Sequence, residues 1–393
     1  MKFVTDSVSR CVARLGKLTE IERMPDSVFE TPLLLVHTQR GTVPHLCKDV
    51  LKMLTKEQQF MLATLPSTLP MADYVKQCNS FSEYVSLQEY PFLLGIQDPT
   101  GVIDGSHQSS TYVSIWSRNG RFSVTPEKYM KVVETFKPDV YVALCDGATD
   151  AQSSQKRVSK AADKSKNFLE KCIRHHENSE ILKNKGLLGS VQGGYNLHAR
   201  ENYINFLKDQ PLLGYVIDGL HTNGISTENI TMDQIRAVIE HCLNLLPVDK
   251  LKVMIGSWNP AVIMDLVALG IDVFDSSYAY LKTEDAKALV FLCTECNHSS
   301  STGLIDFKEK RYIDDFEPIC KSCTCLTCKN HTRAYIYHLI QTKELLAQVL
   351  LMIHNSHVYI EFFKSIRHHI KHGSFHEFRN RVCTIFSTKT EKS

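Results

Sequence analysis

The sequence has little excess charge of either sign and no long hydrophobic run. Its 393 residues include 45 basic and 43 acidic side chains, so the formal net charge is only +2. This balance argues against a protein that binds nucleic acid over its whole surface, although a local basic face remains compatible with it. The sequence contains no run of about 18 apolar residues, so no membrane span is predicted. The first residues lack the apolar core of a secretion signal, so secretion is not expected.

No glycine-rich dinucleotide fingerprint follows an early strand, which argues against a Rossmann fold. Long low-complexity linkers and internal repeats are also missing. Between about residue 30 and residue 275, apolar runs typical of strands alternate with segments of helical length. Such alternation predicts a parallel sheet covered by helices, and units of roughly 30–40 residues suit an eightfold α/β barrel. The predicted strands are Leu33–Val36, Val140–Leu144, Leu187–Val191, Tyr215–Ile217, Val253–Ile255 and Val273–Phe274.

Apolar residues at helical spacing, together with capping residues, predict several helices. One begins at Pro126 with Thr125 as its N-cap, and others cover Ser154–His176, Met232–Leu246 and Pro260–Leu269. We expect a further helix at Thr342–Tyr359, helical spacing from Phe362 to Ile370, and a basic, aromatic tail to Ser393. The helix 154–176 also has a basic face, which we interpret as solvated barrel exterior, with phosphate binding as the alternative; its residues are Lys156, Arg157, Lys160, Lys164, Lys171 and Arg174.

Cysteine is the most informative residue type. The chain has 13 cysteines, an odd number, and no export signal, so thiols or metal ligands are expected rather than disulfides. Six of them cluster as Cys293, Cys296, Cys320, Cys323, Cys325 and Cys328, the last four within nine residues. Zinc prefers four such ligands, and a closed four-ligand site is structural rather than catalytic.

The spacing alone leaves the complete ligand set open. A fourth ligand beside the thiols can be Cys320, His331, His338, His354 or His357. Alternatively, the Cys293 and Cys296 pair combines with Cys320 and Cys323 into a site of the zinc-ribbon type. The alternative without a metal is that these cysteines are reduced thiols packed in a loop.

The motif Cys323-x-Cys325-x-x-Cys328, followed after 25 residues by His354, resembles the zinc site of the tRNA-guanine transglycosylases. The segments Val191–Gly194, Gly214–Leu220 and Gly270–Asp275 also resemble motifs of this family, and the likeness covers about residues 25–380. The resemblance implies a (β/α)8 TIM-type barrel with an inserted zinc-binding subdomain. It also implies one structural Zn²⁺ per subunit, held by Cys323, Cys325, Cys328 and His354. We therefore expect the main part of the barrel at 1–283, the cysteine-rich insertion at 284–340 and completing helices at 341–393.

Family members exchange guanine for another base at the tRNA wobble position, and in eukaryotes the new base is queuine. One aspartate attacks the ribose and a second handles the proton. Asp275 matches the nucleophile, but the residues after it, Ser276 to Tyr280, do not match the family's supporting loop. The motif of the second aspartate is missing, which leaves Asp98 and Asp104 as the proposed substitutes.

The positions that bind the base in the family are only partly matched. Asp146, Gln192 and Gly219 occupy them, and we interpret Gln192 chiefly as a residue that keeps the barrel geometry. However, Gly147-Ala148 follows Asp146 where the family has Glu-Cys. Asp218 replaces the first glycine of the family's pair, and its charged side chain is expected to intrude on a base pocket.

Asp275 is therefore interpreted as a vestigial nucleophile. The resemblance is greatest to the non-catalytic subunit of eukaryotic queuine tRNA-ribosyltransferase, which modifies position 34 of tRNAs with GUN anticodons. It implies a heterodimer with the catalytic subunit, formed through the zinc subdomain, a contribution to tRNA binding, and a homodimer as an option in isolation. It also implies a cytoplasmic location, with peripheral attachment to the mitochondrial outer membrane. The alternatives are an active transglycosylase that uses Asp275, and an unrelated zinc-ribbon barrel protein of RNA metabolism.

Overall fold

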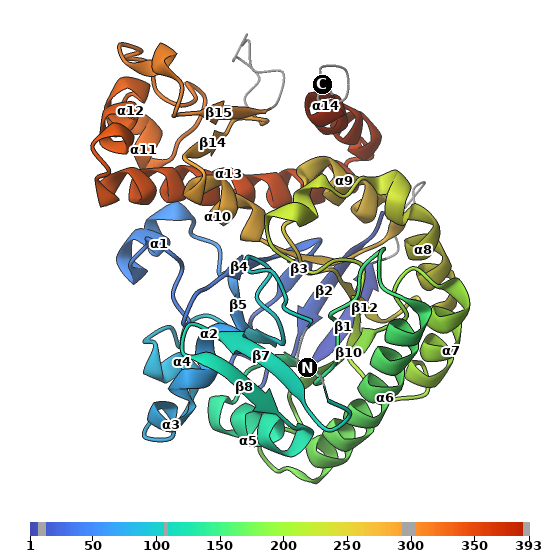
Figure 1. Cartoon of the computed structure of the whole chain (residues 1–393). Coiled ribbons are helices and arrows are strands. Elements are labelled where there is room, and N and C mark those ends of the chain that lie inside the picture. The colour runs from blue at the N-terminus through green and yellow to red at the C-terminus, as the bar shows by residue number, and fades with distance from the viewer. Residues whose placement is uncertain (7–12, 106–108, 293–302, 388–393) are drawn as a thin grey trace.

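Eight parallel strands close into a barrel at the centre of the molecule (Figure 1). A computed structural model describes residues 1–6, 13–105, 109–292 and 303–387. The (β/α)8 prediction is confirmed, because the strands alternate with helices that surround them. In barrel order the strands are β10 (Gly186–Val191), β11 (Gly214–Ile217), β12 (Leu251–Val253), β13 (Val273–Asp275), β4 (Leu33–His37), β5 (Phe60–Thr64), β6 (Phe92–Gly95) and β9 (Val140–Val142).

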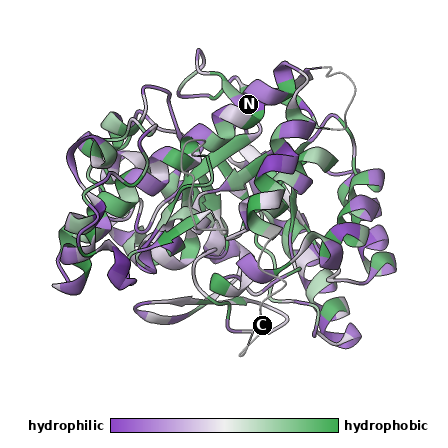
Figure 2. Ribbon diagram, turned by 90° about the horizontal axis from the view of Figure 1, so that it is seen from above, coloured by the Kyte–Doolittle hydropathy of each residue, from purple (hydrophilic) through white to green (hydrophobic). Residues whose placement is uncertain are grey.

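The barrel strands are almost continuously apolar because they are buried on both faces. Figure 2 shows hydrophobic strands in the interior and hydrophilic residues over the outer helices. The seam between β13 and β4 closes the barrel, with Val273 paired to Leu33 and Asp275 paired to Leu35. Asp275 therefore ends its strand at the C-terminal edge of the barrel, which is where active sites of such barrels lie.

The outer helices begin where the sequence predicts caps. Thr125 accepts a hydrogen bond from Lys128 N, and Ser154 accepts one from Arg157 N. All four helices predicted between residues 126 and 269 are present. The helix predicted to begin at Pro126 does so, and the other three end within two residues of their predicted bounds. The helices are α1 (Lys48–Leu54), α2 (Leu65–Thr68), α3 (Ala72–Val75), α4 (Phe81–Tyr84), α5 (Pro126–Phe136), α6 (Gln155–Asn178), α7 (Leu197–Leu207), α8 (Met232–Leu245), α9 (Pro260–Leu269) and α10 (Ser277–Glu284).

Two small antiparallel sheets extend the barrel. An N-terminal sheet consists of β1 (Lys2–Asp6), β2 (Leu15–Thr19) and β3 (Phe29–Thr31), and β3 leads directly into the first barrel strand. A hairpin, β7 (Val113–Ser117) and β8 (Gly120–Val124), lies in the chain between β6 and α5. The hairpin follows the C-terminal end of a barrel strand, and β7 packs against α2.

The cysteine-rich region packs as a lobe on one side of the barrel (Figure 1). It contains β14 (Lys287–Leu289), β15 (Leu304–Asp306), α11 (Leu326–Asn330) and α12 (Arg333–Gln341). Its apolar core includes Ile305, Phe307 and Ile336, and Leu350 and Leu351 from the next helix complete it. That helix, α13 (Leu345–Lys371), is continuous, so the predicted helix 342–359 and the helical spacing after it are one element.

The predicted basic tail forms α14 (Phe375–Ser387), which packs on α9. Among the described residues, no helix is both long and apolar enough to cross a membrane. The predicted division of the chain at residues 283 and 340 remains a prediction.

Candidate metal centre and the mouth of the barrel

Three thiols and one imidazole converge between α11 and α13. The ligand atoms of Cys323, Cys325, Cys328 and His354 all lie within 4.8 Å of one another. The sulfurs lie 3.8, 3.6 and 3.3 Å from His354 Nδ1, in the same order. A tetrahedral zinc ion with its usual bond lengths separates its ligand atoms by roughly 3.5–3.8 Å. The cluster can therefore hold a metal ion of this size.

The imidazole of His354 is oriented for a metal by its second nitrogen. Nε2 lies 2.8 Å from the Leu289 carbonyl oxygen, so it carries the proton and donates, which leaves the Nδ1 lone pair directed at the three sulfurs. His354 is completely buried on α13, and the next residue, Asn355, bonds the backbone of β14 on both sides, at Leu289 N and Lys287 O.

The thiols affect one another's protonation. The thiols of Cys323 and Cys328 lower the pKa of Cys325 to about 3, whereas the contacts with Cys323 and Cys325 raise the pKa of Cys328. Three neighbouring thiolates repel one another unless a cation neutralises them, and a bound divalent metal does so. The donor set and its electrostatics therefore fit a metal of the zinc type.

Other predicted ligands lie elsewhere. Cys320 is buried, but its sulfur contacts Ser322 Oγ at 3.2 Å and is not part of the metal-binding group. His331 stacks on the ring of Tyr335, and His357 contacts Thr324 Oγ1 and the Leu54 carbonyl. The zinc-ribbon alternative depends on Cys293 and Cys296, which lie outside the described residues.

The mouth of the barrel contains the aspartate that matches the family nucleophile. Asp275 is only 1% exposed, and both of its carboxylate oxygens accept backbone hydrogen bonds of 2.7 Å, Oδ2 from Gly256 N and Oδ1 from Ser277 N. Burial raises the pKa of Asp275, although these hydrogen bonds act in the opposite direction. A nucleophilic carboxylate needs an oxygen that can reach the substrate, and this arrangement provides none.

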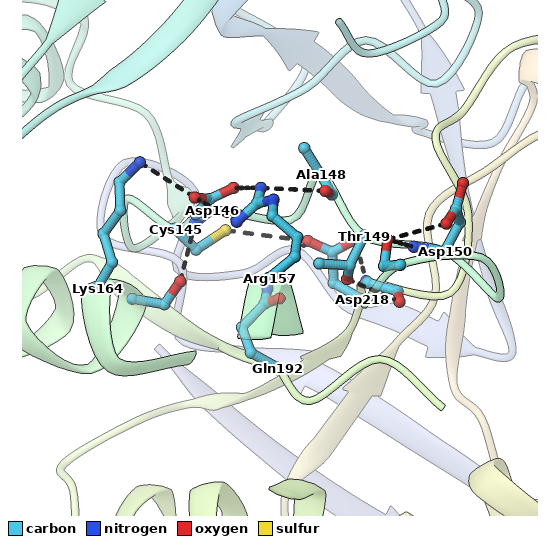
Figure 3. A network of polar contacts seen from close by, with 12 residues as sticks. Cys145, Asp146, Ala148, Thr149, Asp150, Arg157, Lys164, Gln192 and Asp218 are labelled. Carbon is cyan, nitrogen blue, oxygen red and sulfur yellow. Dashed lines mark hydrogen bonds and ion pairs between the residues drawn. The ribbon is translucent and has the colours of Figure 1, made fainter. Parts of the chain in front are cut away.

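Asp146, the position that matches base recognition, is paired with cations of the chain itself. Figure 3 shows Arg157 and Lys164 approaching the Asp146 carboxylate from two sides. Arg157 Nη2 lies 2.6 Å from Oδ1, and Lys164 Nζ lies 3.1 Å from Oδ2. Burial alone raises the pKa of Asp146, but the two cations outweigh it, so the pKa lies below its usual value. Asp146 is only 2% exposed, so its carboxylate is covered by the protein itself.

Asp218 fills the space that the predicted base pocket requires. Its Oδ2 accepts hydrogen bonds from Gln192 Nε2 at 3.3 Å and Ser190 Oγ at 3.4 Å, and its Oδ1 accepts one from Gly219 N at 2.7 Å. A Cβ atom at Gly147 would overlap this carboxylate. Gly219 has a φ of +75°, and a side chain there would meet Thr149. Residues of the chain itself therefore hold the Asp218 carboxylate in place.

The proposed substitutes for the second aspartate do not restore the catalytic pair. Asp98 follows β6 and its Oδ1 accepts hydrogen bonds from Thr100 N and Oγ1, at 2.9 and 2.7 Å. The buried His37 lies beside it, with Nε2 4.0 Å from Asp98 Oδ1. Asp104 is exposed on the loop beyond.

The expectation about the barrel exterior is wrong at two positions of the basic face of α6. Lys156, Lys160, Lys171 and Arg174 are exposed, as expected, but Lys164 is buried and, with Arg157, bonds Asp146. A sequence signal exists for Lys164, because it lies between Ala161 and Phe168 on the apolar stripe of the helix, three residues after the first and four before the second.

Fold and site define a (β/α)8 barrel protein with a metal-binding lobe, in which the aspartates that match the family positions are bonded by the chain itself. The family model for queuine tRNA-ribosyltransferase matches residues 9–388. Curated relatives named queuine tRNA-ribosyltransferase accessory subunit 2 are similar over most of both chains. The Aedes aegypti relative is 41% identical over 94% of this chain and 89% of its own, and the Anopheles gambiae relative 38% over 98% and 90%. A third, from Drosophila mojavensis, is 38% identical over 94% and 89%.

The chain therefore belongs to the queuine tRNA-ribosyltransferase family, the tRNA-guanine transglycosylases. This outcome confirms the resemblance inferred from the cysteine motif.

Proposed function

We propose that this chain is the non-catalytic subunit of a queuine tRNA-ribosyltransferase, which exchanges guanine for queuine at position 34 of tRNAs with GUN anticodons. The observation that supports the proposal most directly is the burial of Asp275, whose two oxygens both accept backbone hydrogen bonds. The printed names of the relatives agree with this role. A chain without an accessible nucleophile serves the reaction by binding a catalytic partner and tRNA.

The test is a base-exchange assay with guanine-containing tRNA and labelled queuine. We expect no exchange by the purified chain, and exchange when the catalytic homologue is added. The Asp275→Ala variant of this chain should support the same rate in the complex. Exchange by this chain alone, lost in Asp275→Ala, would instead establish the active transglycosylase.

The metal centre is proposed to hold one structural zinc ion through Cys323, Cys325, Cys328 and His354. The distances between ligand atoms and the proton on His354 Nε2 support this assignment. When bound, the ion neutralises the thiolates and fixes α11 against α13. It has no part in the exchange chemistry, since all four coordination positions of a tetrahedral ion are filled by the protein.

The lobe that contains the metal cluster is proposed as the heterodimer interface. Large apolar side chains are exposed on it, and Phe316 and Leu345 are 75% and 77% exposed. Exposed apolar residues are expected where a partner covers them. The resemblance extends this proposal to a homodimer when the catalytic subunit is missing. It also extends it to a cytoplasmic complex, with peripheral attachment to the mitochondrial outer membrane.

A pair of substitutions tests the interface. Phe316→Asp should weaken binding to the catalytic homologue by a factor of ten or more, measured by analytical ultracentrifugation, because a charge is then buried at the contact. Val248→Asp is the matched control, since Val248 is also 77% exposed but lies before β12. Equal binding by both variants would place the interface elsewhere.

A further inference from the structure

An open cavity of about 590 Å³ lies at the mouth of the barrel, and its lining residues do not include Asp146, Gln192 or Asp218. Its walls come from the loop after β4, the segment α2–α3, the end of α4, the loop after β6 and the β7–β8 hairpin. The volume lies in the range of sites that bind small ligands or single residues of a polymer. Gln39 on its rim donates a hydrogen bond of 3.1 Å to Tyr280 OH, in the helix that follows Asp275. The cavity therefore lies beside the inaccessible nucleophile position.

Aromatic side chains line this cavity and remain accessible. Trp116, Tyr74 and Tyr84 are 39%, 62% and 36% exposed, although large aromatic residues are usually buried. Trp116 lies on β7 of a regular hairpin, where it pairs with Arg121 of β8, so the strand fixes its position. Flat, accessible aromatic rings on a rigid element are the surfaces on which unpaired nucleic-acid bases stack.

The charges in the cavity favour an anionic ligand. Arg40 and Arg118 line it, and neither forms an ion pair with a carboxylate of the described residues. Asp98 is the one acidic residue among the lining residues that the structure describes, and its Oδ1 is bonded to Thr100. Arg40 has a left-handed backbone, with φ of +55°, within a turn closed by hydrogen bonds between Gln39 and Thr42. Arginines that lack a carboxylate partner are suited to phosphate oxygens.

We propose that this cavity binds one or two unpaired nucleotides of an RNA strand. The bases stack on Trp116 and the tyrosines, and the phosphates bind Arg40 and Arg118. The inference rests on the proposed role in tRNA modification and adds to it the place where this chain contacts RNA. A concave site with two arginines and accessible rings fits a base and its phosphate better than a folded protein surface, whose contact regions are flatter and more apolar at the centre.

The two tryptophans of the chain allow a direct measurement, since Trp116 is accessible and Trp258 is only 1% exposed. Binding of an unmodified tRNA with guanosine at position 34 to the zinc-loaded full chain should quench tryptophan fluorescence. The quenching should disappear in Trp116→Phe, which keeps a ring and most of the affinity. Trp116→Ala should weaken tRNA binding about tenfold, measured by fluorescence anisotropy.

Charge variants test the phosphate contact. Arg118→Gln should weaken tRNA binding several-fold and lower the slope of affinity against salt by about one unit. Lys208→Gln is the control, because it removes one positive charge from the exposed C-terminal end of α7 and should leave both quantities unchanged. A fully paired RNA duplex should compete poorly with tRNA, since its bases are not available for stacking.

The outcomes separate this inference from the proposed function. If Trp116→Ala and Arg118→Gln bind tRNA as the unmodified chain does, while the complex with the catalytic homologue is active, the cavity inference is wrong and the accessory role stands. If these variants lose binding to the catalytic homologue but not to tRNA, the cavity is a protein contact and the inference is overturned. If the unmodified chain does not support exchange at all, the proposed function fails independently of the cavity.

Discussion

The metal cluster and the barrel mouth both consist of residues that match family motifs, but their atoms are used differently. In the cluster, His354 Nδ1 and three sulfurs point toward one common position. In the mouth, Asp275, Asp146 and Asp218 direct their carboxylates at backbone amides or side chains of the chain itself. A family motif therefore indicates function only where its functional atoms remain able to bind a metal or a ligand and are not already bonded to other residues of the chain. The architecture of the family is present here, and the accessible chemistry is not.

Removing a metal ligand should have the largest effect. Cys325→Ser and His354→Ala should lose the bound metal and destabilise the lobe and α13 by several kcal/mol, because structural zinc binding contributes on the order of 10 kcal/mol in small domains. Metal analysis by mass spectrometry and thermal unfolding measure this. Cys320→Ser should retain both metal and stability. Unchanged metal content in the first two variants would reject the ligand set.

Neutralising Asp146 should have the next largest effect. Asp146→Asn leaves Lys164 and Arg157 without their counter-charge and should cost about 3–5 kcal/mol in the free energy of unfolding, measured with urea. Asp163→Asn, on the exposed side of the same helix, is the control. Equal stability of the two variants would contradict the importance of the ion pairs.

The same aspartate predicts a dependence on acid. The pKa of Asp146 is lower in the folded state than in the unfolded chain, where it is about 3.9. The contribution of Asp146 to the free energy of unfolding is therefore complete above that unfolded value and is lost as pH falls through the folded one. The stability gap between the native chain and Asp146→Asn should therefore narrow below about pH 4. A gap that stays constant in urea titrations down to pH 3 would argue against a charged Asp146.

Changing Asp275 should affect stability moderately and activity not at all. In Asp275→Asn the amide turns a donor toward the N–H of Gly256 or Ser277, which should cost about 1–3 kcal/mol. The exchange rate of the complex at saturating tRNA should not change. A fall in that rate without a loss of folded protein would give Asp275 a role in the reaction.

Opening the base pocket should have the smallest effect. Asp218→Gly removes the half-buried carboxylate beside Gly147 and should lower stability by about 1 kcal/mol, because its hydrogen bonds are lost. The variant should still not exchange guanine by itself, since Asp275 remains buried. Guanine exchange by Asp218→Gly would show that this side chain alone inactivates the barrel.

The sequence predicted six of the eight barrel strands, and the exceptions have physical reasons. The strands β5, Phe60–Thr64, and β6, Phe92–Gly95, are short apolar runs that fit a buried helix equally well. The strand β12 begins at Leu251, two residues before its prediction, because the buried Lys252 interrupts the apolar pattern. Its Nζ lies near three backbone carbonyls, and burial lowers its pKa to about 8.

The site was predictable where ligands lie close in sequence and unpredictable where partners come from separate elements. The thiols Cys323, Cys325 and Cys328 lie within six residues, so their convergence follows from a tight turn. The pairing of Asp146 with Lys164 depends on how α6 crosses the end of β9, and the spacing of charges along a helix does not contain that information.

The length of α13 has a mechanical consequence for the whole molecule. Its 27 residues extend over about 40 Å, with His354 in the metal cluster and Arg367 donating a hydrogen bond of 3.0 Å to the Pro32 carbonyl beside the first residue of β4. The continuous helix therefore connects the lobe to the seam where β13 meets β4. A metal ion that fixes the helix at the lobe also restrains the pair of strands at which the barrel closes.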